Sequence, residues 1–533
     1  MKTKIVTDIA RRAGGPLKRL SLCVALVSAI LAGASPGLAQ TKPNNTVLPL
    51  LGDAASGDLS PVIERKLGEE IMRDIKRNLD YLDDDPILEY LNNFGNALVA
   101  AYPGARGEAN YEYFFFAVRD PMLNAFALPG GFIAVHSALM LAAQTESELA
   151  SVMGHEIGHV AQRHIARMIG QQKQDVLIPL AAMLLAVLAS KAGGNSDAAI
   201  GVMMGGQGLA IQRQLNFSRD AEREADRVGF QIMSGGGYDT SGMVAFFGRM
   251  QAASRNYSDL MPAYLRSHPL TSERISDIQA RIRETPYRQR VDGLEFHLVR
   301  ARARVLQDES TSGRAETVAA FSAQMLQQNR QQQAGAQYGM AYLSLKQGEL
   351  AKAQTWLDRA RSTMKRSEGT FSTGQAASDG AALFASMGVD IKMAPGQSEA
   401  VRQQGLNDAA QAHQAYPLSR GIARQYAQAM ISNGKLDDAT RFLREQIQSY
   451  REEPKLHDLL AKAYAVQGKQ ALQHIALAES YALNGTLLPA LEQLAIARKA
   501  PDASFYDMAL IDARERELQA KRREELKEAK KEK

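Results

Sequence analysis

The stretch TESELASVMGHEIGH, residues 145–159, decides how the N-terminal half of this 533-residue chain folds. Thr145 and Glu148 have the spacing of a capping box, in which two side chains close the first turn of a helix. Further along this predicted helix, His155 and His159 are four residues apart, so both imidazoles project from one face, about one turn from each other. Two imidazoles in this arrangement can hold one Zn²⁺ at ~2.0–2.1 Å.

Glu156, directly after the first of these histidines, supplies the group that a zinc-dependent hydrolase needs. A carboxylate beside the metal can take a proton from a metal-bound water and later deliver it to a leaving amine. Gly158 is expected to leave space near the metal. The chain has nine histidines, so chance matches to this pattern number on the order of 0.01. The competing interpretation is a pair of histidines that bind nothing.

A catalytic zinc needs a third protein ligand, and the best candidate lies on a second predicted helix, SRDAEREAD at residues 218–226. Glu222 and Asp226 are four residues apart and therefore share one face. We interpret Glu222 as the ligand and Asp226 as the acceptor of a hydrogen bond from a ligand imidazole, whose tautomer it would fix. Glu224 points elsewhere and is expected to pair in solvent. By spacing alone, a solvated helix acid explains Glu222 equally well, because acids on helices are usually exposed.

The segments around these two helices predict a mostly α-helical domain with a small β-sheet over residues 60–290. The low aromatic content, 6% of residues, disfavours an extended all-β architecture. Helix starts are indicated by a serine or aspartate next to a proline, and strands by short apolar runs. The expected elements are helices from Ser60 to about Asn78 and from Asp85 to about Val99, strands at 111–118 and 131–135, and helices over most of 137–286.

Helix pairs that repeat around a glycine turn are predicted for residues 296–500. Alanines occur seven residues before and five residues after Gly348, Gly434 and Gly485, where they let two helices approach closely. Gly434 and Gly468 are 34 residues apart, which is the period of a tetratricopeptide helix pair. The region therefore resembles a degenerate tetratricopeptide array, which usually presents a concave groove to peptides or partners. Generic helical hairpins are the alternative.

The first 39 residues have the pattern of a secretory signal peptide. Six basic residues and one acid accompany an apolar run from Leu20 to Ala32, and small residues precede a predicted cleavage after Ala39. An uncleaved membrane anchor is the alternative, although the run is shorter than the ~20 residues that a span needs. Cleavage would remove Cys23, the one cysteine in the sequence, which suits an oxidising compartment such as the periplasm and excludes disulfides.

The charge balance excludes one class of partner. The chain contains 63 basic and 58 acidic residues, but 57 of each remain once residues 1–39 are removed. A chain without excess positive charge gives no overall electrostatic reason to bind nucleic acid. The dense mixture of charges in residues 501–533 is instead expected to form a solvated helical tail.

Three motifs together resemble the M48 family of zinc metallopeptidases. They are HEIGH at residues 155–159, the distant Glu222-x-x-x-Asp226, and NAFALPGG at residues 124–131. This ligand pattern is that of a gluzincin, in which a glutamate on another helix is the third ligand. With a signal peptide and a tetratricopeptide-like region, the chain is similar to periplasmic members of the family in Gram-negative bacteria over about residues 60–500.

The resemblance implies a zinc metalloendopeptidase with one zinc ion per chain, bound by His155, His159 and Glu222, and with Glu156 as the general base. Residues 124–135 would form an edge strand beside the cleft, where a substrate backbone can add as a further strand with little sequence preference. The substrate-binding residues expected on this strand are Asn124, Ala125, Phe126 and Gly131.

The resemblance also implies substrates and partners. Unfolded or misassembled outer-membrane β-barrel proteins are the expected substrates, and the barrel-assembly machinery of the outer membrane is an expected partner. One rival function is a chaperone or assembly scaffold that uses the repeat region while the peptidase site is repressed or silent. A second rival is a general quality-control peptidase without preference for barrel proteins.

His268, in SHPLT at residues 267–271, is a further candidate of the site. Pro269 restricts its backbone and helps to aim it, and the resemblance favours a histidine that faces the zinc. As a fourth ligand it would close the resting enzyme until a mobile loop withdraws it. Alternatively it stabilises an oxyanion, or is an ordinary residue at a helix entry. His136 and His164 are expected to be structural.

Two apolar runs, at residues 176–189 and 198–211, are too short to span a bilayer. Buried core helices explain them as well as a lid over the cleft or a contact with the membrane surface. Glycines in and around the second run favour mobility of this segment.

Overall fold

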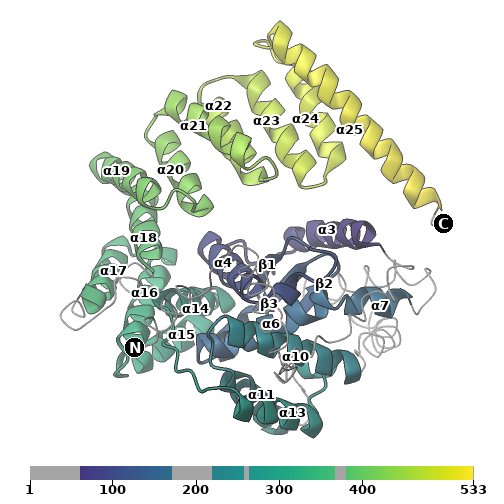
Figure 1. The fold of residues 1–533 in the computed structure, drawn as a ribbon. Coiled ribbons are helices and arrows are strands. Elements are labelled where there is room, and N and C mark those ends of the chain that lie inside the picture. The colour runs from purple at the N-terminus through teal and green to yellow at the C-terminus, as the bar shows by residue number, and fades with distance from the viewer. Residues whose placement is uncertain (1–59, 171–218, 257–262, 366–379, 532–533) are drawn as a thin grey trace, which may run out of the picture. The chain divides into compact units, whose positions relative to one another are not determined.

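The computed structural model describes residues 60–170, 219–256, 263–365 and 380–531 (Figure 1). These residues are mostly α-helical and include one three-stranded sheet, which confirms the predicted fold class. The predicted signal peptide and the apolar runs at 176–189 and 198–211 lie outside the described residues. Within the described ranges, none of the helices has both the length and the apolar character needed to cross a membrane.

The first two helices begin at capped starts, close to the predicted positions. α3 spans Pro61–Arg77, and the Ser60 hydroxyl accepts a hydrogen bond at 3.3 Å from the amide three residues later. α4 spans Asp85–Ala101. Its cap is Asp84, one residue before the predicted start, which accepts the equivalent hydrogen bond at 3.2 Å.

The sheet has the strand order β1-β3-β2, so β3 is its central strand. β1 (Phe114–Val118) runs parallel to β3 (Phe132–His136). β2 (Ala125–Leu128) is antiparallel to β3, and Phe126 lies opposite Ala134. Most residues of these strands are buried, so the sheet is part of the core of the N-terminal region.

This sheet corrects two predictions. The strand expected at 111–118 begins only at residue 114. The edge strand expected over 124–135 is a hairpin, and only its first strand, β2, lies at the edge of the described sheet. Gly131, expected on the edge strand, is buried in the hairpin turn with φ of 95°, a backbone conformation that favours glycine. It therefore cannot bind substrate as an edge residue.

α6 (Glu146–Ala161) contains the HEIGH motif and is buried along its whole length. Thr145 caps it as predicted, since its hydroxyl accepts a hydrogen bond at 3.2 Å from the amide three residues later. α10 (Arg219–Gly235) packs directly against α6. At Gly158 a Cβ atom would lie 2.8 Å from the Ala225 carbonyl oxygen. The missing side chain thus permits the close approach of the two helices, and the predicted role of Gly158 in leaving space near the metal stays a prediction.

Shorter elements complete this part of the chain. The described parts of residues 137–286 are helical apart from short connections, as predicted. These elements are α5 (Ser137–Ala142), α7 (His164–Gly170), α11 (Ser241–Asn256), α12 (Ala263–Ser267), α13 (Ser272–Glu284) and a 3-10 turn at Pro103–Arg106.

Successive helices continue from residue 294, and glycine turns join several of them at the predicted positions. Gly348, Gly434, Gly468 and Gly485 all have φ between 72° and 76°. At each turn the amide after the glycine donates to the carbonyl five residues earlier, at 2.9 Å after Gly434, a closure that the left-handed conformation permits. The assignment of these pairs to tetratricopeptide repeats stays a prediction. The helices are α14 (Leu294–Gln307), α15 (Thr311–Met325), α16 (Arg330–Lys346), α17 (Leu350–Lys365), α18 (Ala381–Met393), α19 (Glu399–Ala415), α20 (Arg420–Ser432), α21 (Leu436–Ser449), α22 (Pro454–Val466), α23 (Gln470–Leu483) and α24 (Leu487–Lys499).

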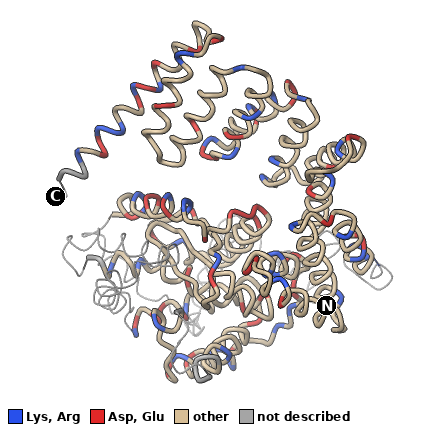
Figure 2. Tube along the Cα trace, turned by 180° about the vertical axis from the view of Figure 1, so that it is seen from behind, with Lys and Arg blue, Asp and Glu red and all other residues tan. Residues whose placement is uncertain are grey.

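The charged tail forms α25 (Phe505–Lys531), along which acidic and basic residues alternate (Figure 2). It is not solvated on all sides. Ile511 and Leu518 are buried in a cluster with apolar residues of α23 and α24. Part of the predicted solvated tail therefore packs on the preceding helices.

Candidate active site

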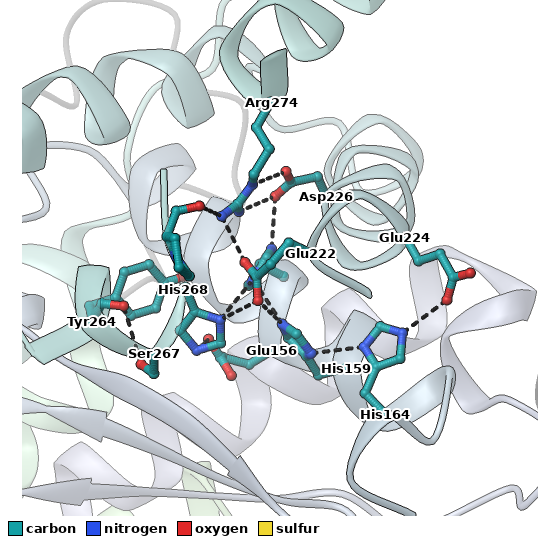
Figure 3. Close-up of polar contacts among 12 residues, drawn as sticks. Glu156, His159, His164, Glu222, Glu224, Asp226, Tyr264, Ser267, His268 and Arg274 are labelled. Atoms are coloured by element: carbon teal, nitrogen blue, oxygen red, sulfur yellow. Dashed lines mark hydrogen bonds and ion pairs between the residues drawn. The ribbon is translucent and has the colours of Figure 1, made fainter. Parts of the chain in front are cut away.

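Separate elements bring together the side chains that were predicted for a metal site. α6 supplies His155 and His159, α10 supplies Glu222, and His268 directly follows α12. Each offers one ligand atom, and the four atoms lie within 4.8 Å of one another. Figure 3 labels three of these residues, His159, Glu222 and His268. All four side chains are buried, so an ion bound between them would be shielded from bulk water.

The spacing of these atoms fits a tetrahedral zinc ion. Bonds of ~2.0–2.1 Å place neighbouring ligands of a tetrahedron about 3.3 Å apart. The Nε2 atoms of His155 and His159 are 3.0 Å apart, and they lie 3.5 Å and 3.4 Å from the two carboxylate oxygens of Glu222. Nδ1 of His268 is 3.4 Å from Nε2 of His155. The residues can therefore offer two imidazoles and a carboxylate to zinc, with a third imidazole at the remaining position.

Glu156 lies beside this cluster, and one of its carboxylate oxygens accepts no hydrogen bond from the described residues. The side chain is buried, and within the described part of the chain its Oε1 has no hydrogen-bond partner. This oxygen is 3.6 Å from Nε2 of His268. A buried carboxylate oxygen without a donor is unfavourable. The arrangement is suited to an oxygen that accepts a proton from water during a reaction.

Arg274, on α13, is a member of the site that the sequence did not indicate. Its guanidinium donates to both oxygens of Asp226, at 2.6 Å and 2.8 Å, and to the Pro269 carbonyl at 2.8 Å. It also lies 2.7 Å from Glu222. Asp226 in turn lies 2.9 Å from Nδ1 of His155, the contact predicted for it. One cation therefore links Glu222, Asp226 and the backbone next to His268.

Hydrogen bonds and charges set the protonation of the metal-free site. Burial raises the pKa of Asp226, but hydrogen bonds from Arg274 and His155 outweigh it and lower that pKa. Burial lowers the pKa of His155, but its contacts with Asp226 and Glu222 outweigh burial and raise the pKa to about 9. For His159, burial dominates and the pKa falls well below its ordinary value. The carboxylates are thus kept ionised, as a cation site requires.

Comparison with known proteins identifies this region. The sequence profile of peptidase family M48 matches residues 95–282. The chain carries a family M48 peptidase domain. It is a zinc metallopeptidase, and its buried cluster of three histidines and a glutamate has ligands that zinc takes.

Individual relatives extend beyond this M48 domain. The beta-barrel assembly-enhancing protease of Escherichia coli (strain K12) is 28% identical over 496 residues, 93% of this chain and 95% of that protein. A Vibrio cholerae protein, whose name as such a protease is provisional, is 38% identical over 288 residues; the match spans about half of each chain, 53% of this one and 56% of that one. The mitochondrial metalloendopeptidase OMA1 of Schizosaccharomyces pombe is 24% identical over 233 residues, 41% of this chain and 64% of that protein.

On the side of His159 the site contains further contacts that were not predicted from the sequence. Nδ1 of His164 lies 2.8 Å from Nδ1 of His159 (Figure 3). On its other side, Nε2 of His164 is 3.0 Å from Glu224, which also accepts a hydrogen bond from Arg167 at 2.7 Å. The prediction that Glu224 pairs in solvent was wrong, because its side chain is only 13% exposed and contacts the site. His164 does not join the metal cluster, but it touches one of its members.

The edge strand β2 packs against the helix that carries the HEIGH motif. It has no partner on its outer side among the described strands. Of the residues predicted to bind substrate, Ala125 is buried and Phe126 is half-buried. The Asn124 carbonyl accepts a hydrogen bond at 3.0 Å from the His136 amide, which extends the hairpin by one residue. A strand with an unpaired edge can accept an added backbone.

Proposed function

We propose that His155, His159 and Glu222 hold the zinc ion and that Glu156 is the general base. The observation that carries this proposal is the buried cluster on α6 and α10, whose ligand atoms have the spacing of a tetrahedral site. Zinc supplies an acidified water and polarises the scissile carbonyl when it is bound. The unengaged oxygen of Glu156 takes the water's proton and passes it to the leaving amine.

We infer further roles for Asp226 and Arg274, which neighbour this cluster, and for His268, its fourth member. Asp226 positions His155 through the 2.9 Å contact with Nδ1, and Arg274 holds that carboxylate ionised. His268 is a fourth ligand in the resting enzyme. Its Nδ1 lies 2.9 Å from Glu222 and faces the cluster, while Nε2 lies 3.6 Å from Glu156. Cleavage then requires that His268 withdraw and leave its position to water or substrate.

The proposed substrates are misassembled outer-membrane β-barrel proteins in the periplasm. The names of the Escherichia coli and Vibrio cholerae relatives support a role in barrel assembly, and the predicted signal peptide supports the compartment. The unpaired edge of β2 beside α6 suits unfolded strands, because strand addition recognises the backbone. The predicted helical repeats would contact substrate or the barrel-assembly machinery.

Digestion of a panel of unfolded proteins tests this substrate class. Zinc-loaded full-length protein is incubated with unfolded barrel proteins and with unfolded soluble proteins of similar length. Faster cleavage of the barrel proteins supports the proposal, whereas equal rates favour general quality control. Glu156→Gln is the control for contaminating proteases, and it is expected to lose cleavage while keeping zinc.

A scaffold function is the second candidate. The buried contact of His268 with the cluster favours it, because a site closed by a fourth ligand would be silent at rest. Complementation of a barrel-assembly defect by Glu156→Gln separates the two. Full rescue by the variant supports the scaffold, and loss of rescue supports the peptidase.

A further inference from the structure

We propose that His164 and Glu224 form a relay that fixes the tautomer and ring orientation of His159, and that both are positioning residues of the metal site. This inference rests on the proposed ligand role of His159. It begins with the distance of 2.8 Å between Nδ1 of His159 and Nδ1 of His164. At this distance one nitrogen must carry the proton and the other must present its lone pair.

The groups at the two ends of this relay, a metal bound by His159 and the carboxylate of Glu224, decide which nitrogen carries the proton. An imidazole that binds a metal through Nε2 keeps its proton on Nδ1, so His159 must donate and Nδ1 of His164 must accept. The proton of neutral His164 then lies on Nε2, which is 3.0 Å from Glu224. A carboxylate only accepts hydrogen bonds, and Arg167 holds this one in place at 2.7 Å. Each contact therefore agrees with a single tautomer of both rings.

The backbone between His159 and His164 leaves the helical path, and this allows the two rings to meet. Residues five apart on a continuous α-helix differ by about 140° in direction, so they cannot face each other. Here α6 ends at residue 161, and Arg163 adopts φ of 51° before α7 begins at His164. A left-handed conformation is unfavourable for a non-glycine residue, and the buried ion pair of Arg163 with Glu64 at 2.9 Å holds it. Such strain is typical of functional sites.

The two ligand imidazoles are thus supported differently. His155 contacts a carboxylate directly, at 2.9 Å from Asp226. On its Nδ1 side, His159 contacts a second imidazole, that of His164, which in turn contacts Glu224. Because hydrogen-bond partners of this kind are worth about 10–100-fold in metal affinity, removal of the relay is expected to weaken zinc binding by that factor.

Zinc dissociation constants, measured by competition with a chelator, test the relay in the full-length protein. His164→Leu and Glu224→Leu, which remove the acceptors of the relay, are expected to weaken binding 10–100-fold. In His164→Asn, the amide oxygen stands near the former Nδ1 and can accept from His159, so affinity is expected within about threefold of wild type. Asp220→Asn, an exposed acid on the same helix α10, is the matched control and should not change affinity.

The outcomes distinguish failure of the relay from failure of the ligand assignment. If His159→Ala abolishes binding but His164→Leu and Glu224→Leu bind zinc within twofold of wild type, the relay is wrong. If His159→Ala itself binds normally, the proposed ligand set is wrong. Nitrogen NMR of the zinc-loaded wild type, labelled at histidine, gives a test that needs no folded variant. A proton on Nε2 of His164 supports the relay, and a proton on its Nδ1 overturns it.

Discussion

Replacement of Arg274 by methionine, a residue of similar length without charge, should destabilise the metal-free enzyme more than any single surface change. The guanidinium is 3% exposed, donates to both oxygens of Asp226 and lies 2.7 Å from Glu222. Its loss leaves two buried carboxylates without their shared cation and leaves the Pro269 carbonyl without this donor. Breaking a buried ion pair from one side costs about 3–5 kcal/mol.

The expected change can be read from thermal unfolding. For a cooperative unit of 150–250 residues, each kcal/mol lowers the melting temperature by about 2–4 °C, so Arg274→Met should melt roughly 6–20 °C below wild type. Arg281→Met is the matched control on the same helix α13. Its guanidinium is 32% exposed and pairs with Asp277 at 3.0 Å, which is worth at most about 0.5 kcal/mol.

A second comparison in this assay uses the melting temperatures of the zinc-loaded proteins. A divalent ion bound by Glu222 would compensate part of the lost positive charge, so the difference between Arg274→Met and wild type should shrink in zinc-loaded protein. Differential scanning calorimetry with and without zinc measures both values. A melting temperature of metal-free Arg274→Met within 2 °C of the Arg281→Met control would refute the idea that this arginine balances the buried acids.

Two further perturbations test other parts of the structure. Gly158→Ala should force α6 and α10 apart, because the new Cβ would lie 2.8 Å from the Ala225 carbonyl oxygen. We expect the free energy of unfolding to fall by about 1–3 kcal/mol and zinc binding to weaken. Gly248→Ala, whose new Cβ meets nothing within 4 Å, should cause neither change. Burial, aided by the charge of Arg300, lowers the pKa of His297 to about 4. Its neutral form therefore contributes stability that is complete above the unfolded pKa near 6.5 and is lost progressively as the pH falls from 6.5 to the folded pKa of about 4. His297→Leu should therefore lose roughly 3 kcal/mol less than wild type between pH 7 and pH 4, and unfolding midpoints that fall in parallel for the two proteins would contradict this.

The parts of the structure that were predictable are those set by short-range spacing. The four-residue interval of His155 and His159, the cap at Thr145 and the glycine turns at 434 and 468 are properties of one helix or one turn. That Glu222 and Asp226 lie on the same face of one helix was predictable for the same reason. The spacing of residues along a helix predicts which side chains share one face, and the structure confirms those shared faces.

The parts that were missed depend on which elements meet. Arg274 lies 48 residues from Asp226 in the sequence, and no periodicity links them. His164 was expected to be structural, and its contact with His159 was missed because it depends on the left-handed Arg163, which turns the chain back towards His159. The hairpin that contains β2 was not predicted, because a strand of four residues is too short to show a clear pattern of apolar and polar residues.

Zinc K-edge absorption on the full-length wild type, combined with metal analysis, tests the metal site most directly. We expect one zinc per chain with a first shell of nitrogen and oxygen only, near 2.0–2.1 Å, and with the scattering of at least two imidazoles. Glu222→Gln should change this shell and weaken binding. A zinc content well below one per chain, or a shell without imidazole that is unchanged in Glu222→Gln, would contradict the assignment of α6 and α10 as the elements that hold the metal.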